Sequence, residues 1–199
     1  MRDVVTILYN NFETLDVFGP IEVFGRVPEQ FNPVFYSLAG GIVTSTQNVP
    51  VMTTPLAELK SSRYILFIPG GIGARDEENN DAFVAAIRSL AGNAEFILTV
   101  CTGSILLSRT GLLDGKRATS NKKAFAWTRT APGVTWIKNA RWVKDGTIYT
   151  SSGVSAGIDM ALGFIADTCG YALAKQVSRE IEYTWNEDPC RDPFAELYP

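Results

Sequence analysis

Short apolar runs alternate with helical patterns along the whole chain, and this alternation constrains the fold more than any other feature. Strands that are apolar on both faces and separated by helices form parallel βαβ units. The pattern therefore predicts an α/β fold, a doubly wound three-layer sandwich with a mainly parallel sheet. We expect strands at residues 4–9, 34–38, 64–68 and 95–100, and helices at about 16–24, 82–90, 122–129, 159–168 and 172–186.

Two segments differ from this pattern and predict hairpins. Residues 42–52 turn around Gln47-Asn48, and Asp145-Gly146 separates short strands at 140–143 and 147–150, after another short strand at 134–136. The tail from Asp188 onwards is predicted to be irregular. With 199 residues and no repeat or linker, the chain is expected to form one domain, 1–199.

Composition excludes several classes of function. A net charge of −3 and a pI near 5.1 give no basic footprint, so we expect no nucleic-acid partner. No apolar stretch reaches the roughly 18 residues of a membrane span, and the N-terminus lacks a signal-peptide cleavage pattern. The three cysteines include no close-spaced ligand pair, so no disulfide framework and no metal are expected, and a cytoplasmic location fits.

The chain contains no histidine. This excludes every mechanism that needs an imidazole base or ligand within the chain, including a Cys–His peptidase.

Cys101 is the strongest candidate nucleophile. It follows a buried strand and precedes an apolar helix, which is the arrangement of a nucleophile elbow. The helix N-terminus is expected to lower the thiol pKa and favour thiolate. Most free cysteines are simply buried packing residues, and we interpret Cys169 in that way.

Two further loops follow predicted strands and should meet Cys101 at the carboxyl edge of the sheet. Residues 70–73 (GGIG) suit an oxyanion hole, since glycines let backbone N–H groups turn towards a ligand. Asp16 opens the first predicted helix, where it is either an N-cap or a carboxylate that relays a proton to Cys101. Asn121 either lines a pocket or, more simply, caps the helix at residue 122, and the four tryptophans are interpreted as core or subunit-interface aromatics.

Five segments together resemble the ThiJ/PfpI superfamily. The nucleophile and glycine-loop segments match the superfamily, and the first and late segments match its isocyanide hydratases and the sensor domains of AraC-type regulators. The segments are 14–24 (TLDVFGPIEVF), 68–73 (IPGGIG), 100–104 (VCTGS), 111–119 (GLLDGKRAT) and 152–162 (SGVSAGIDMAL).

The chain also departs from that family at three positions. Amidase and peptidase members have histidine after the cysteine, where this chain has Thr102. The deglycase-like branch has glutamate on the first helix, whereas Asp16 resembles the isocyanide hydratases. Many members of that branch have a histidine near Asn121, and its absence makes the substrate the open question.

The resemblance implies a flavodoxin-like homodimer without metal or cofactor, acting on a small-molecule substrate. Cys101 and Asp16 would be catalytic, with backbone donors at Gly71, Ile72 and Thr102, and with Val154 and Asn121 in the pocket. The implied reaction is hydration of an isocyanide to an N-formamide. The alternatives are a non-catalytic or redox-sensing protein in which Cys101 oxidises reversibly, and a glyoxalase or deglycase.

Overall fold

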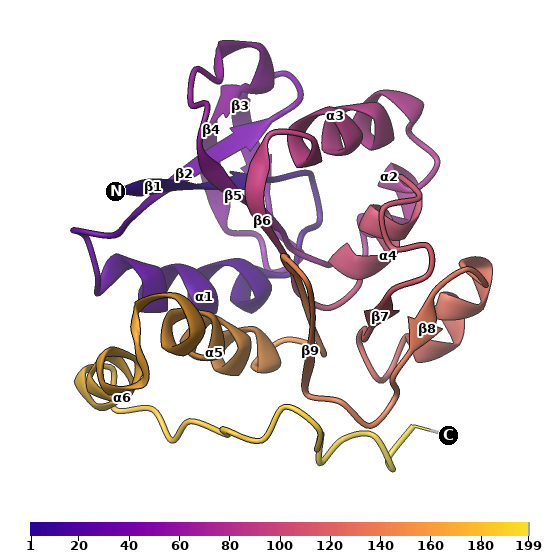
Figure 1. Ribbon diagram of the computed structural model, residues 1–199. Coiled ribbons are helices and arrows are strands. Elements are labelled where there is room, and N and C mark those ends of the chain that lie inside the picture. The colour runs from indigo at the N-terminus through magenta and orange to yellow at the C-terminus, as the bar shows by residue number, and fades with distance from the viewer. Residues whose placement is uncertain (199) are drawn as a thin grey trace.

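A central eight-stranded sheet organises the part of the chain that the computed structural model describes, residues 1–198. The strand order is β3-β4-β2-β1-β5-β6-β10-β9 (Figure 1). All pairings are parallel except β3 with β4 and β9 with β10, so the predicted mainly parallel sheet is confirmed. The strands are β1 Arg2–Ile7, β2 Phe31–Ser37, β3 Gly41–Thr44, β4 Pro50–Pro55, β5 Tyr64–Ile68, β6 Ala94–Thr99, β9 Trp142–Asp145 and β10 Ile148–Ser151, and β7 Arg117–Ala118 pairs with β8 Thr135–Trp136 in a separate small sheet.

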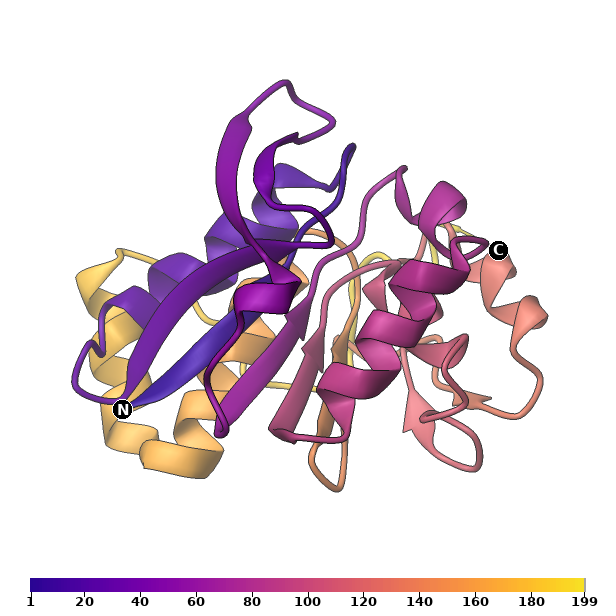
Figure 2. The same ribbon diagram turned by 90° about the horizontal axis from the view of Figure 1, so that it is seen from above.

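Helices cover both faces of the sheet, as Figure 2 shows. One layer contains α1, α5 and α6, and the other contains α2, α3 and α4. The α/β/α sandwich predicted from the alternation is therefore confirmed. The helices are α1 Thr14–Gly25, α2 Ala74–Glu77, α3 Asp81–Ala91, α4 Gly103–Ser108, α5 Ala156–Cys169 and α6 Tyr171–Glu180, with short 3₁₀ turns η1 Leu56–Glu58 and η2 Phe125–Thr130.

The central strands are apolar throughout because each face of the sheet carries its own hydrophobic core. In β5, Leu66 and Ile68 pack into the core beneath α3 and α4, while Ile65 and Phe67 pack into the core beneath α1 and α5. Side chains alternate across a strand, so a strand buried on both faces needs an unbroken apolar run. Cys169 and the four tryptophans pack into or against these cores, as predicted.

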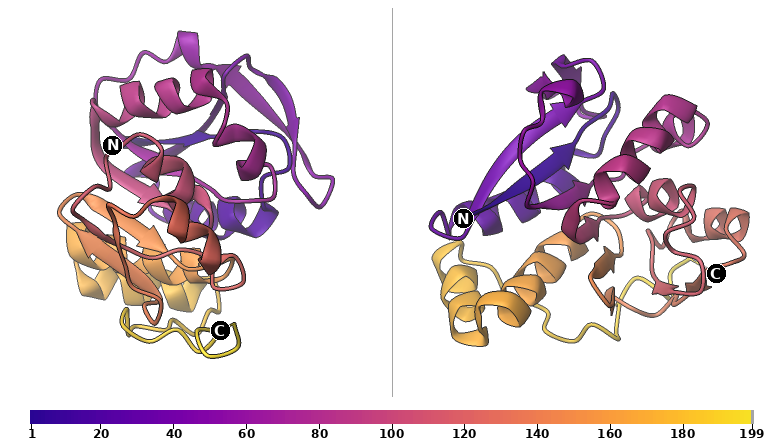
Figure 3. Two further views of the ribbon diagram at one scale, coloured as in Figure 1. Left: turned by 90° about the vertical axis from the view of Figure 1, so that its right-hand side faces the viewer. Right: turned by 45° about the horizontal axis from the view of Figure 1, so that its top comes forward.

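Both predicted hairpins form. The β3–β4 hairpin extends away from the helices at one end of the sheet (Figures 2 and 3), and β9 and β10 pair on either side of Gly146. β2 begins three residues earlier than predicted and includes Pro33, which interior strands normally exclude. Of the residues in β2, only Tyr36 and Ser37 pair with β4. Pro33 therefore pairs with β1 alone and has no partner on the β4 side.

Two helix predictions need correction. The helix expected over 172–186 ends at Glu180, because Glu182 has a φ of 50° and a left-handed residue cannot continue a helix. The helix expected over 122–129 is instead the 3₁₀ turn η2, in which backbone N–H groups such as that of Ala131 donate to the carbonyl three residues earlier, Thr128 O at 3.0 Å.

Candidate functional site

Cys101 lies in a strained turn between β6 and α4, so the predicted strand–turn–helix geometry is present, while the role of Cys101 as nucleophile stays a prediction. Its φ is 58°, a conformation that a non-glycine residue adopts only when its surroundings enforce it. The Cys101 N–H donates to Ser152 O at 3.1 Å. Its carbonyl accepts from Ser104 Oγ and Ser120 Oγ, each at 3.0 Å. No spacing in the sequence indicates the positions of Ser120 and Ser152, because they reach Cys101 only in the folded chain.

The backbone of the glycine loop, residues 70–73, packs directly against the backbone of the Cys101 elbow. A Cβ atom at Gly70 would lie 2.5 Å from Thr102 N, and one at Gly103 would lie 2.3 Å from Ile68 O. Only glycine allows this approach. The Gly71 N–H donates to Thr102 Oγ1 at 3.1 Å, so this predicted oxyanion donor is already occupied. The roles of the Ile72 and Thr102 N–H groups stay predictions.

Asp16 is fully buried on the first turn of α1 and faces the elbow. The helix is preceded by Glu13 as the N-cap residue, so the N-cap interpretation of Asp16 is wrong. Asp16 Oδ2 instead accepts from Gly70 N at 3.0 Å, and Oδ1 is buried with no hydrogen-bond partner among residues 1–198. The Cys101 thiol approaches the same carboxyl and lowers its pKa. The structure thus brings together the carboxylate and the thiol that the sequence placed on separate loops.

Val154 and Asn121 complete the surroundings of this pair. Val154 has a φ of 49°, an outlier for a β-branched residue, and its N–H is directed at the Asp16 carboxyl. Asn121 Oδ1 accepts from Ala124 N at 2.9 Å, but no helix begins at residue 122, so Asn121 stabilises the turn before η2 rather than capping the predicted helix. The Asn121 side chain also approaches the Cys101 thiol and lowers its pKa, so this residue also belongs to the site.

Burial is the largest influence on the pKa values of both Asp16 and Cys101. It raises the pKa of Asp16 from 3.8 to about 8, and burial together with the Asp16 charge raises the pKa of Cys101 well above its ordinary value. The expectation of a lowered thiol pKa is therefore wrong. Hydrogen bonds from Thr102 and Asn121 lower the thiol pKa, but they do not offset the loss of solvation. Two adjacent buried acids do not both ionise at neutral pH, so the pair retains a proton that it can donate.

The raised pKa predicts how Cys101 will react with iodoacetamide. At pH 7 the exposed Cys190 should be alkylated faster than the buried Cys101. The Cys101 rate should still rise above pH 9, and Asp16→Asn should shift that rise to lower pH because it removes a negative charge beside the sulfur. Rates at each pH, assigned by peptide mass spectrometry, test this. A Cys101 rate that levels off below pH 8 in the wild type would contradict it.

A buried ionic cluster next to the site has no signal in the sequence. Arg141 Nη2 lies 2.8 Å from Asp159 Oδ2, and Arg141 Nη1 lies 3.7 Å from Asp192 Oδ1. Lys122 Nζ lies 3.9 Å from Asp192 Oδ2, and burial lowers the pKa of Lys122 to about 8. The cluster joins the C-terminal tail to the segments that follow the elbow.

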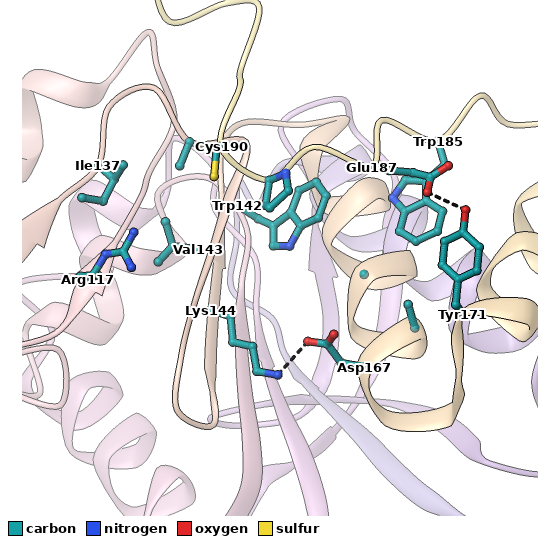
Figure 4. Close-up of a pocket in the computed structure, with 14 residues that line it drawn as sticks. Arg117, Ile137, Trp142, Val143, Lys144, Asp167, Tyr171, Trp185, Glu187 and Cys190 are labelled. Atoms are coloured by element: carbon teal, nitrogen blue, oxygen red, sulfur yellow. Dashed lines mark hydrogen bonds and ion pairs between the residues drawn. The ribbon is translucent and has the colours of Figure 1, made fainter.

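A pocket of about 480 Å³ lies away from Cys101. Figure 4 shows Trp142 and Trp185 in its wall, beneath the tail segment that carries Cys190, with Lys144 paired to Asp167 at 2.8 Å. Within residues 1–198 no helix is long and apolar enough to span a bilayer, and no three His, Cys, Asp or Glu side chains cluster as metal ligands. Neither Cys101 nor Asp16 lines this pocket, so the candidate site is the Cys101–Asp16 pair rather than the 480 Å³ pocket.

Comparison with known proteins gives a consistent family. The profile of the DJ-1/PfpI family matches residues 2–167. The isonitrile hydratase of Pseudomonas putida is 33% identical over 180 residues, which are 89% of this chain and 76% of that enzyme. The HTH-type transcriptional regulator CdhR of Pseudomonas aeruginosa is 29% identical over 90% of this chain but only 54% of its own length.

Solved structures agree with this assignment. A ThiJ/PfpI family protein from Pseudomonas syringae has a TM-score of 0.80 and 26% identity, and the match covers 92% of this chain and 75% of that one. DJ-1beta of Drosophila melanogaster also has a TM-score of 0.80, with 21% identity over 92% of this chain and 99% of its own, and so supports the fold alone. The chain belongs to the DJ-1/PfpI family.

Proposed function

We propose that this protein is a cysteine-dependent hydratase that converts a small isocyanide to the corresponding N-formamide. The observation that carries the proposal is the buried Cys101–Asp16 pair in a chain without histidine. A thiol nucleophile beside a carboxyl that stays protonated near neutral pH supplies both the nucleophile and the acid that such a hydration needs. The similarity to the isonitrile hydratase of Pseudomonas putida supports the same reaction.

In the proposed reaction, Cys101 and Asp16 act in three steps. Cys101 sulfur bonds to the terminal isocyanide carbon while that carbon takes a proton from Asp16 and the thiol proton passes to the same carboxyl, giving a thioimidate. Water then adds across the C=N bond, its hydroxyl bonding to carbon and its proton to nitrogen. Finally the C–S bond breaks, the sulfur regains a proton, and the hydroxyl loses one through Asp16 to leave the N-formamide.

The backbone groups around the pair fit these steps. The Thr102 N–H, directed at the sulfur, stabilises negative charge as the C–S bond forms and breaks. Asp16 Oδ2 is held by the Gly70 N–H, so Oδ1 is the oxygen left to exchange protons. We propose that the protein acts as a cytoplasmic homodimer and that Ile72 contributes a further N–H donor.

A redox-sensing role receives less support from the site. Sensor cysteines are accessible and have a low pKa, whereas Cys101 is buried and its pKa is raised. Similarity to a transcriptional regulator keeps this role as the second candidate. A glyoxalase or deglycase activity is the third.

Assays of the purified protein separate the three functions. We expect conversion of benzyl isocyanide to N-benzylformamide, followed by chromatography, and no comparable consumption of methylglyoxal. Turnover of methylglyoxal alone would favour the glyoxalase. Absence of both activities, with Cys101 oxidised by low peroxide concentrations before Cys190, would favour the sensor.

A further inference from the structure

A second, smaller pocket of about 240 Å³ lies beside the catalytic pair. Its floor contains Asn121, Gly153 and Val154, and its outer wall contains Phe194 and Tyr198 from the C-terminal tail. The outer wall thus comes from a segment remote in sequence from the elbow. The remaining lining residues are Lys122, Lys123, Ser152 and Ser155.

The pocket adjoins the elbow, because Ser152, which lines the pocket, accepts the Cys101 N–H at 3.1 Å. Two other lining residues lie near the reacting groups: Asn121 lowers the pKa of the Cys101 thiol, and the Val154 N–H lowers that of the Asp16 carboxyl. Asn121 packs closely against Gly153, since a Cβ atom at Gly153 would lie 2.1 Å from Asn121 Nδ2. A group that occupies the pocket therefore lies beside the elbow that carries Cys101.

The tail is anchored so that its aromatic residues stay over the pocket. Asp192 is buried between Arg141 and Lys122, and its N–H donates to Asn139 O at 2.7 Å. Asp192 Oδ1 in turn accepts from Phe194 N at 2.9 Å. The tail crosses beneath α5 and β9 (Figure 1). An anchored wall of this kind can select a substrate by shape.

The two aromatic side chains of the tail give the pocket wall its apolar character. Phe194 is 47% exposed and Tyr198 is 39% exposed, so both rings are accessible to a molecule in the pocket that they line. Of the two lysines that line the pocket, Lys122 turns its Nζ inward to Ala140 O, and the exposed Lys123 is the one that carries positive charge there. The wall therefore offers apolar, aromatic surface to whatever enters.

We propose that Phe194 and Tyr198, on the tail that Asp192 anchors, form the specificity wall of the active site and bind the organic substituent of the substrate. This inference rests on the proposed function, because an isocyano group is small and linear and its substituent must lie elsewhere. The wall favours isocyanides that carry an aryl or bulky apolar group over methyl isocyanide.

The Phe194→Ala variant tests the wall through turnover. Its kcat/KM for benzyl isocyanide should fall about tenfold, mainly through KM, while that for methyl isocyanide stays within about twofold. Leu197→Ala is the matched control, since Leu197 is a more exposed tail residue, 65% exposed, that does not line the pocket. Equal losses for both substrates, or equal effects of both variants, would overturn the proposal.

Alkylation of Cys101 gives a second readout that does not require catalysis. The ratio of its rates with N-phenylmaleimide and N-methylmaleimide should fall about fivefold in Phe194→Ala, with exposed Cys190 as the internal reference. A lowered ratio in a protein that hydrates no isocyanide would retain the wall and reject the proposed function. An unchanged ratio in an active enzyme would reject the wall alone.

Discussion

Replacing Cys101 with serine is expected to lower kcat for isocyanide hydration at least about a thousandfold. The hydroxyl is a far weaker nucleophile, and no imidazole in the chain can activate it. The fold should persist, because serine has nearly the volume of cysteine. The strained φ of 58° is also held by hydrogen bonds that the backbone of residue 101 makes with Ser104, Ser120 and Ser152, which do not change. Steady-state assays with benzyl isocyanide, together with thermal unfolding, measure both effects.

Cys169→Ser is the appropriate control for this loss. Cys169 is partly buried at the end of α5 and packs against the core, away from the elbow. Its replacement should leave kcat within about twofold of wild type. If Cys101→Ser retained activity within about tenfold of wild type, covalent catalysis by Cys101 would be wrong.

Replacing Asp16 with asparagine is expected to lower kcat at least about a hundredfold, because the amide cannot exchange a proton with the thiol or with the substrate carbon. The same change should also stabilise the protein at alkaline pH. In the wild type the carboxyl pKa is about 8 in the folded state, compared with the ordinary value of 3.8 for an exposed aspartate. The folded state therefore binds more protons than the unfolded state between these values, and stability falls as the pH rises through this window.

Urea unfolding of the wild type and Asp16→Asn at pH 5 and pH 8 measures this linkage. The free energy of unfolding of the variant, relative to wild type, should increase by about 2–4 kcal/mol from pH 5 to pH 8. Asp16→Glu retains a titratable carboxyl and is the control for the loss of charge. A constant difference between variant and wild type across this range would show that Asp16 does not titrate as inferred.

The consequences of local patterning could be predicted from the sequence. The run at 64–68 is apolar because its strand is buried on both faces, and glycine is required at Gly70 and Gly103 because backbone meets backbone there. The meeting of Cys101 and Asp16 also followed from topology, since parallel strands end at the same edge. These features depend on residue order, which the sequence contains in full.

Other features depended on contacts between remote segments. The direction of the Cys101 pKa shift could not be predicted, because it results from burial and from the Asp16 charge, whereas the sequence shows only the nearby helix. A positive φ usually occurs at glycine, but position 154 is a valine, so nothing in the sequence indicates its positive φ.

The sequence by itself determined the layered sheet, the elbow at Cys101 and the absence of any imidazole chemistry, because strand periodicity, turn residues and composition are local properties. Only the tertiary structure decided that Asp16 accepts from Gly70 instead of capping its helix, and that Asp192 anchors the tail over the pocket. Solvation and pairing of charges depend on what surrounds a group in space, and that environment exists only once the chain has folded.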